Sequence, residues 1–186
     1  MEKWQAEMTA DVWYADTLQM TAHRNQTRDQ LAEISQIADN ELRNGEYAKL
    51  LGHVGADFFV ETGFSFSFGA NITIGDDFYA NKDVLLCDEG QITIGKHCKI
   101  GPRAAFYTPL HPLDAAKRRT GVEKVGPITL GDDVWIGGSA TILPNVTLGN
   151  DVVVGAGSVV TKSFPNHVVI AGNPARIIRH LNQTGH

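Results

Sequence analysis

Cysteine is scarce in this sequence, with only Cys87 and Cys98 among 186 residues. Two cysteines at this separation are too few for a disulfide framework or a thiolate metal cluster. We therefore expect both to be small, partly buried side chains without a chemical role.

Long apolar runs and excess positive charge are also missing. No stretch approaches the roughly 20 apolar residues that cross a bilayer, and the opening segment MEKWQAEMTADVWYAD is charged throughout, unlike a signal peptide. The formal net charge of -5 provides no general attraction for phosphates. The sequence predicts a soluble, cytoplasmic protein with no membrane or nucleic-acid partner.

Apolar residues nevertheless make up 42% of the chain, enough for a sizeable core. Before about residue 52 the chain is rich in charge and poor in proline, and its apolar residues have helical spacing, with Asp39 or Asn40 able to cap a second helical segment. These apolar positions are Leu31, Ile34, Ile37, Ala38, Leu42 and Leu50. Gly, Val, Ile and Asn then become frequent. We predict an N-terminal helical segment over residues 1–52 and a second unit over residues 53–186.

The second unit contains a six-residue repeat of aliphatic or aromatic residues. The repeat runs without interruption through Leu130, Ile136, Ile142, Leu148, Val154 and Val160. Upstream it forms three sets separated by two extra residues: Val54, Val60 and Phe66; Ile74, Ala80 and Leu86; Ile94, Ile100 and Phe106. A smaller residue follows most members four positions later, with Phe164 as a larger exception. Neither a helix nor a simple strand has a period of six, so the repeat predicts a three-sided solenoid of stacked coils.

The repeat is interrupted between Phe106 and Leu130, where TPLHPLDAAKRRTGVEKVGP is inserted. We expect a loop over residues 107–127 that protrudes from the solenoid, and long loops in compact domains are often functional. Pro109 and Pro112 restrict the backbone on both sides of His111. This rigidity suits a positioned base and an ordinary stiff loop alike, but the position in a long insertion favours a functional histidine.

Several segments show a closer resemblance: FSFGANITIGDDFYAN, HPLD, GPITLGDDVWIGGSATILPNVTLG and VVGAGSVVTKSFPNHVVIAGNPARIIR. Over about residues 4 to 180, the sequence is similar to the maltose, galactoside and nodulation-type sugar O-acetyltransferases of the hexapeptide-repeat family. The resemblance implies a mainly β fold, a left-handed parallel β-helix over about residues 54 to 175, preceded by the α-helical segment. It also implies acetyl-coenzyme A as acetyl donor, a homotrimer, and His111 as the catalytic base.

The same resemblance implies the residues that bind the two substrates. The acceptor-sugar positions are Asp16, Ser67, Tyr79, Asn81, Asp88 and Glu89. The acetyl-coenzyme A positions are Gly138, Ala156, Thr161, Lys162, Arg176 and Arg179. Tyr79 is equally readable as an aromatic covering the solenoid, Asn81 as a turn or ladder residue, and the basic C-terminal residues as a solvated tail. Glu89 stands where one family member has a shorter aspartate, and Asp11 replaces a usual glycine, so the acceptor stays open.

The implied chemistry follows from ordinary acid–base behaviour. A histidine titrates near neutral pH, so His111 can remove the proton of a sugar hydroxyl as that hydroxyl attacks the thioester. No GxSxG motif supplies an enzyme nucleophile. The backbone N–H of Gly138 is the implied donor to the tetrahedral oxyanion. Glu123 either orients the imidazole or is a solvated loop charge.

Three other functions are compatible with a solenoid. A zinc enzyme would need neighbouring histidines, and the seven histidines lack the expected close pair, so we expect no metal. A non-catalytic assembly module would not need His111. Transfer to another hydroxyl or an amine is the remaining enzymatic alternative. A narrow prism brings acceptor and donor residues together most easily between subunits, which also favours a trimer.

Overall fold

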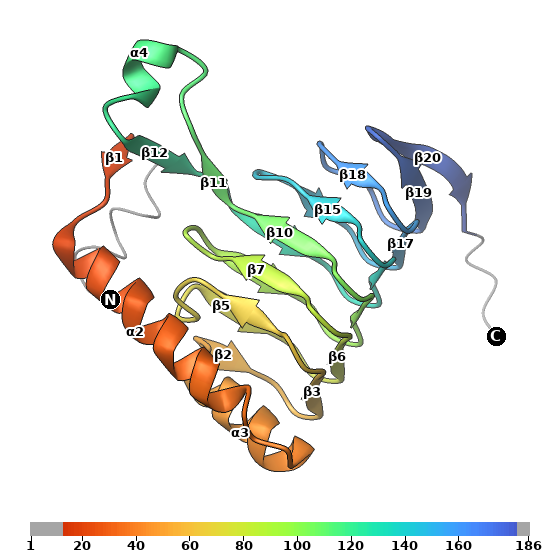
Figure 1. Ribbon diagram of the computed structural model, residues 1–186. Helices are drawn as coiled ribbons and strands as arrows, with labels where there is room; N and C mark the ends of the chain where they lie inside the picture. The colour runs from red at the N-terminus through yellow and green to blue at the C-terminus, as the bar shows by residue number, and fades with distance from the viewer. Residues whose placement is uncertain (1–12, 182–186) are drawn as a thin grey trace.

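The computed structural model describes residues 13–181, and its main body is a parallel β-helix with three faces (Figure 1). The first face contains β2 (His53–Val54), β5 (Ile72–Ile74), β8 (Ile92–Ile94), β13 (Ile128–Leu130) and β16 (Thr147–Leu148). The second contains β3 (Phe58–Val60), β6 (Phe78–Ala80), β9 (Lys99–Ile100), β14 (Trp135–Ile136), β17 (Val152–Val154), β19 (Val168–Gly172) and β20 (Ala175–His180). The third contains β4 (Ser65–Phe66), β7 (Leu85–Cys87), β10 (Ala105–Tyr107), β15 (Thr141–Ile142) and β18 (Val159–Val160).

Strand register places the six-residue repeat in continuous columns inside the prism. On the second face the column runs through Val60, Ala80, Ile100, Ile136, Val154 and Ile170. All six side chains are buried, so each coil covers the apolar surface of the next. Phe164 differs from the predicted phase: it pairs with Leu148 on the first face, because the corner after Val160 is two residues shorter than a full repeat.

The corners of the coils need left-handed backbone, which explains their composition. Asp77, His97, Asp133 and Asp151 all have positive φ, a region that Asp and Asn tolerate better than most residues. Side chains beside these corners also connect the coils. The Lys96 amide donates to Asp132 Oδ1 at 2.8 Å.

Two helices cover the N-terminal end, α2 (Leu18–Ile34) and α3 (Asn40–Leu50). Asp39 caps α3 by accepting from the Leu42 amide at 2.8 Å, as one of the two predicted caps. The predicted apolar face was wrong at Leu42, which is 56% exposed. Arg43 and Asn44 are buried instead, because α3 lies on the open end of the first coil, where Asn44 bonds both backbone groups of Val60.

The insertion between β10 and β13 folds into a small sheet rather than an irregular loop. It contains β11 (Pro109–Leu110), α4 (Ala115–Arg118) and β12 (Val122–Val125), and β11 and β12 are antiparallel. The N-terminal strand β1 (Tyr14–Ala15) pairs with the other side of β12 (Figure 1). The first described residues thus contact the protruding insertion, although the two segments are far apart in the sequence. The division of the chain near residue 52 stays a prediction.

The two cysteines are free, with Cys98 buried and Cys87 partly buried, as expected. Burial raises the pKa of the Cys87 thiol to about 12 and that of Cys98 to about 11. Both thiols are therefore protonated and unreactive at neutral pH. Within residues 13–181, none of the helices has the length and apolarity needed to span a bilayer.

Candidate active site

An acidic cluster forms where the N-terminal strand, the insertion and the third face of the β-helix meet. Tyr14 on β1 lies opposite Glu123 on β12 in the antiparallel register. Asp16 follows β1, and its Oδ2 accepts from Arg24 Nη2 of α2 at 2.6 Å. Glu89 follows β7, and its charge acts on Tyr14, Arg24 and Glu123. Four separate segments of sequence therefore contribute to one site.

His111, the residue directly after β11, lies beside this cluster. Burial raises the pKa of the Glu123 carboxyl, and the nearby His111 lowers it by a smaller amount. The two residues lie on neighbouring strands of the insertion, whose register pairs Leu110 with Lys124. His111 itself is exposed, so its imidazole is open to solvent in the single chain. A basic ring beside a partly buried carboxylate can accept a proton from a bound hydroxyl.

Four buried polar atoms in this region have no hydrogen-bond partner among the described residues: Tyr14 Oη, Arg24 Nε, Asp88 Oδ2 and Glu89 Oε2. Leaving such groups unpaired costs about 1–3 kcal/mol each, so proteins rarely bury them without a reason. Both donors and acceptors are present. A polyhydroxylated ligand, whose hydroxyls donate and accept, would suit them.

Asp88 combines a structural contact with an unusual charge state. Its Oδ1 accepts from the backbone amides of Ser67 and Phe68, both at 2.8 Å. Burial is the largest effect on this carboxyl and raises its pKa to about 7, with Glu89 adding to the rise. Asp88 therefore holds the turn that carries Ser67 while its second oxygen stays unpaired.

Two predicted acceptor residues lie elsewhere in this chain. Tyr79 is on β6 of the second face and stacks on Phe59, with ring centroids 6.0 Å apart. Asn81 Oδ1 accepts from the Lys82 amide at 2.8 Å, a local turn contact. The single chain therefore brings Asp16, Asp88 and Glu89 close to the insertion, but leaves Tyr79 and Asn81 on another face.

Two of the predicted donor positions, Gly138 and Ala156, lie at the corner between the second and third faces on successive later coils. The amides of Gly137 and Ser139 donate to Val154 and Pro102 carbonyls at 2.8 Å. No such partner within residues 13–181 accepts from the intervening Gly138 amide, nor from that of Ala156 one coil further on. A Cβ on Gly137 would lie 2.5 Å from the Ala156 nitrogen, which explains why this position needs glycine.

The basic residues at this end are all exposed. Thr161 and Lys162 follow β18, and Lys162 Nζ lies 5.6 Å from the Phe164 ring centroid. Arg176 and Arg179 lie on β20, where Arg176 bonds only neighbouring carbonyls. These four side chains are therefore available for contact with an anionic ligand.

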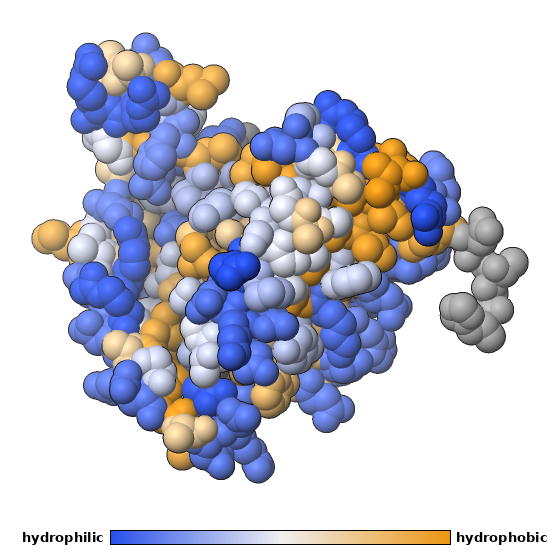
Figure 2. Space-filling model, turned by 45° about the vertical axis from the view of Figure 1, so that its right-hand side comes forward, coloured by the Kyte–Doolittle hydropathy of each residue, from blue (hydrophilic) through white to orange (hydrophobic). Residues whose placement is uncertain are grey.

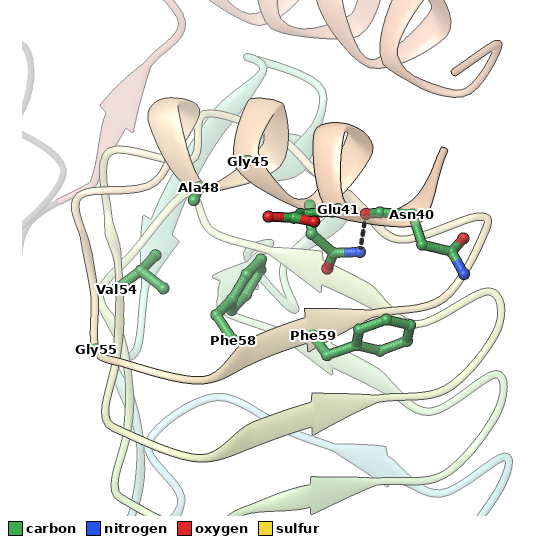
Figure 3. Close-up of a pocket in the computed structure, with 9 residues that line it drawn as sticks. Asn40, Glu41, Gly45, Ala48, Val54, Gly55, Phe58 and Phe59 are labelled. Atoms are coloured by element: carbon green, nitrogen blue, oxygen red, sulfur yellow. Dashed lines mark hydrogen bonds between the residues drawn. The ribbon is translucent and has the colours of Figure 1, made fainter. Parts of the chain in front are cut away.

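A hollow of about 470 Å³ lies elsewhere, between α3 and the first coil (Figure 3). Phe58, Val54 and Ala48 supply much of its apolar lining. Its buried amide, Asn44, is already bonded to Asn40 and Val60, and none of the buried unpaired polar atoms found in residues 13–181 belongs to its lining. His111 directly follows β11, and Figure 1 shows the insertion with β11 and α4 on the opposite side of the molecule from α3. The unpaired groups, rather than the hollow, mark the candidate active site.

The fold and this site define a class of proteins. Residues 127–162 match the family model described as bacterial transferase hexapeptide (six repeats). The chain is 40% identical over 148 residues to the galactoside O-acetyltransferase of Escherichia coli K12, spanning 80% of this chain and 73% of the relative. It belongs to the hexapeptide-repeat acetyltransferase family.

Two solved structures resemble this chain over nearly its whole length. A maltose O-acetyltransferase from Clostridium difficile 630 has a TM-score of 0.94 at 34% identity, covering 98% of this chain and 99% of the other. A galactoside acetyltransferase in complex with coenzyme A has a TM-score of 0.92 at 34% identity, covering 98% and 92%. The predicted fold is confirmed: the chain is a left-handed parallel β-helix of the kind found in maltose and galactoside O-acetyltransferases.

Sequence reasoning missed Tyr14 and Arg24. Tyr14 lies within WYAD beside a predicted residue and Arg24 lies further along in α2, but nothing local distinguishes either of them. Their role depends on β1 pairing with β12 and on α2 folding back over Asp16. Among residues 13–181, no three His, Cys, Asp or Glu side chains are grouped so that they could hold a metal ion.

Proposed function

We propose that this protein transfers an acetyl group from acetyl-coenzyme A to a hydroxyl of a sugar. The observation that carries the proposal is the meeting of His111 and Glu123 with a cluster of buried, unpaired polar groups. The relatives give further support, since they include a maltose O-acetyltransferase and a galactoside acetyltransferase solved with coenzyme A. A related acetyltransferase from Vibrio cholerae, 35% identical over 98% of this chain, was solved with acetyl-coenzyme A.

In this mechanism His111 is the general base. The imidazole takes the proton of the acceptor hydroxyl as its oxygen attacks the thioester carbonyl, and the resulting imidazolium returns a proton to the departing thiolate. Glu123 acts as a positioning residue, because its partly buried carboxylate favours the imidazolium and fixes the ring. Asp16, Ser67, Asp88 and Glu89 hold the sugar, and no covalent acetyl-enzyme is required.

The edge of the later coils holds acetyl-coenzyme A. The unpaired Gly138 amide donates to the oxyanion of the tetrahedral intermediate. Ala156 and Thr161 contact the pantetheine arm through their backbones, and Lys162, Arg176 and Arg179 bind its phosphates. These cations lie on β20 or just after β18 in the last coils, several coils beyond Asp88 and Glu89, which follow β7, and this supports the proposed direction of binding.

We further propose that the working enzyme is a homotrimer with sites shared between subunits. Within one chain, Tyr79 and Asn81 face away from the acidic cluster, so a neighbouring subunit is needed to complete the acceptor site. Large apolar side chains are also exposed: Trp135 by 56% and Ile178 by 65%. Hydrophobic side chains gather near the C-terminal end in Figure 2. A cytoplasmic location stays a prediction.

Hybrid trimers test this sharing. Chains carrying His111→Ala are mixed and reassembled with chains carrying Asn81→Ala, two variants that are each expected to have little activity alone. Because the two residues would come from different subunits, mixed trimers should regain a substantial fraction of wild-type activity. A fully active monomer, or trimers without recovery, would contradict a site shared in this way.

An acceptor screen tests the function itself. Purified protein is supplied with acetyl-coenzyme A and maltose, glucose, galactosides, serine and an aminoglycoside, and thiol release is followed together with the mass of the product. We expect O-acetylated sugar. Acetylation confined to serine or an amine would replace the sugar assignment, and no thiol release with any acceptor would remove it.

A further inference from the structure

Tyr14 is a buried phenol without a partner, in a site whose other members are mostly acceptors. Its side chain is 9% exposed, and Tyr14 Oη makes no hydrogen bond among the described residues. Burial raises the pKa of the phenol well above its ordinary value, and the charges of Glu123 and Glu89 act in the same direction. At neutral pH the group is therefore a neutral hydroxyl able to donate.

The placement of Tyr14 is fixed by backbone pairing. β1 pairs with β12 so that Tyr14 lies directly opposite Glu123, the neighbour of the proposed base. Residues directly opposite in an antiparallel pair have neighbouring side chains on one face. Tyr14 and Glu123 therefore point to the same side of the small sheet. The charge of His111 acts on Glu123, so the proposed base lies near Tyr14 as well.

The chemistry of the surrounding groups is complementary to an alcohol. Glu89 Oε2 is buried and lacks a donor, whereas Tyr14 Oη is buried and lacks an acceptor. A sugar accepts through its hydroxyl oxygens and donates through its hydroxyl protons, so it can satisfy both groups at once. A protonated amine donates but cannot accept, so it could satisfy Glu89 but not Tyr14.

We propose that Tyr14 is an acceptor-specificity residue, which donates a hydrogen bond to a sugar hydroxyl while Glu89 accepts one from the same sugar. This inference rests on the proposed function and adds a residue to it. A buried donor that is paired only in the complex also discriminates against acceptors that lack the matching hydroxyl, since the donor then stays unpaired.

The test compares Tyr14→Phe with the matched control Tyr47→Phe. Tyr47 is also a buried tyrosine, but it lies on α3 and packs edge-on against Phe64, at 5.6 Å. We expect Tyr14→Phe to raise the KM for the sugar by about tenfold, with the KM for acetyl-coenzyme A within about twofold of wild type. Tyr47→Phe should leave both constants unchanged.

Two further measurements separate binding from structure. The Tm of Tyr14→Phe should equal or exceed that of wild type, because the free enzyme loses only an unpaired buried hydroxyl. A series of monodeoxy sugars should contain one member for which wild type and Tyr14→Phe have the same KM. That sugar lacks the hydroxyl that Tyr14 binds.

The outcomes distinguish this inference from the function on which it rests. If wild type acetylates no sugar, the proposed function fails and the inference with it. If wild type acetylates sugars and Tyr14→Phe has the same KM for every one of them, only the role of Tyr14 is overturned. A lowered Tm with unchanged kinetics would likewise assign Tyr14 a structural role.

Discussion

Two regions of the protein have opposite construction. The first, which we call the acidic end, is where β1, β12 and α2 meet the residues after β7, and it buries acidic and unpaired polar side chains such as Asp88 and Glu89. The second, the basic end on the later coils, offers backbone amides at Gly138 and Ala156 that have no backbone partner within residues 13–181, with exposed cations beyond them. The difference matches the two proposed substrates: a neutral polyol that needs side-chain hydrogen bonds, and a long anion that lies along the later coils.

The largest expected effect comes from removing the proposed base, which lies beside Glu123 at the acidic end. His111→Ala should lower turnover by about 10²- to 10⁴-fold, because it removes the base, while the KM for acetyl-coenzyme A changes little. Steady-state kinetics measure both. Turnover within a few-fold of wild type would show that His111 is an ordinary loop residue.

The acidic end should also make the stability of the protein depend on pH. The folded-state pKa of Asp88, about 7, lies above its ordinary value of 3.8, so its ionisation opposes folding and stability is lost as pH rises from the ordinary value through the raised one. The full cost is roughly 4 kcal/mol at high pH, since one pKa unit corresponds to about 1.36 kcal/mol. Asp88→Asn should therefore flatten the fall in Tm between about pH 4 and pH 7. An unchanged fall would mean that Asp88 is not the group responsible.

The basic end should respond to salt instead. Replacing Arg176 and Arg179 together with Ala should raise the KM for acetyl-coenzyme A by about tenfold at low ionic strength. The ratio between variant and wild type should shrink in high salt, where ions screen the wild-type contacts. Equal KM values for variant and wild type at low salt would show that these arginines are solvated and do not bind acetyl-coenzyme A.

The smallest effect concerns the hollow under α3. Gly45 lies inside that helix and lines the hollow, and a Cβ added to this glycine would meet no atom within 4 Å. Gly45→Ala should stabilise the protein by about 0.5–1 kcal/mol, the usual helical advantage of Ala over Gly. Denaturant unfolding measures this gain. Kinetics with the sugar should not change, and a raised KM would show that the hollow takes part in acceptor binding.

The two ends also differ in how far the sequence predicts them. The coils follow from the six-residue period because each aliphatic side chain meets its equivalent in the next coil, as Ile136 meets Ile100 and Val154. The glycines that directly follow these aliphatic residues, such as Gly137, could be located from the same period. Phe164 was misplaced because a shortened corner leaves no mark in the period.

The acidic end and the packing of α3 on the first coil both depend on contacts between distant segments. Tyr14 approaches Glu123 only through the β1–β12 pairing, and the burial of Arg43 and Asn44 depends on α3 closing the first coil. Local spacing cannot reveal either contact. The family resemblance supplied His111 and the residues for each substrate, and their roles are still predictions.

The most direct test of this division is to measure the KM for both substrates in one variant at each end. Glu89→Gln at the acidic end and the double replacement of Arg176 and Arg179 by Ala at the basic end are each assayed against both substrates. We predict that Glu89→Gln raises the KM for the sugar by about tenfold or more and leaves that for acetyl-coenzyme A within about twofold, while the arginine variant does the reverse. Equal changes in both constants for either variant would contradict the division of the β-helix into an acceptor end and a donor end.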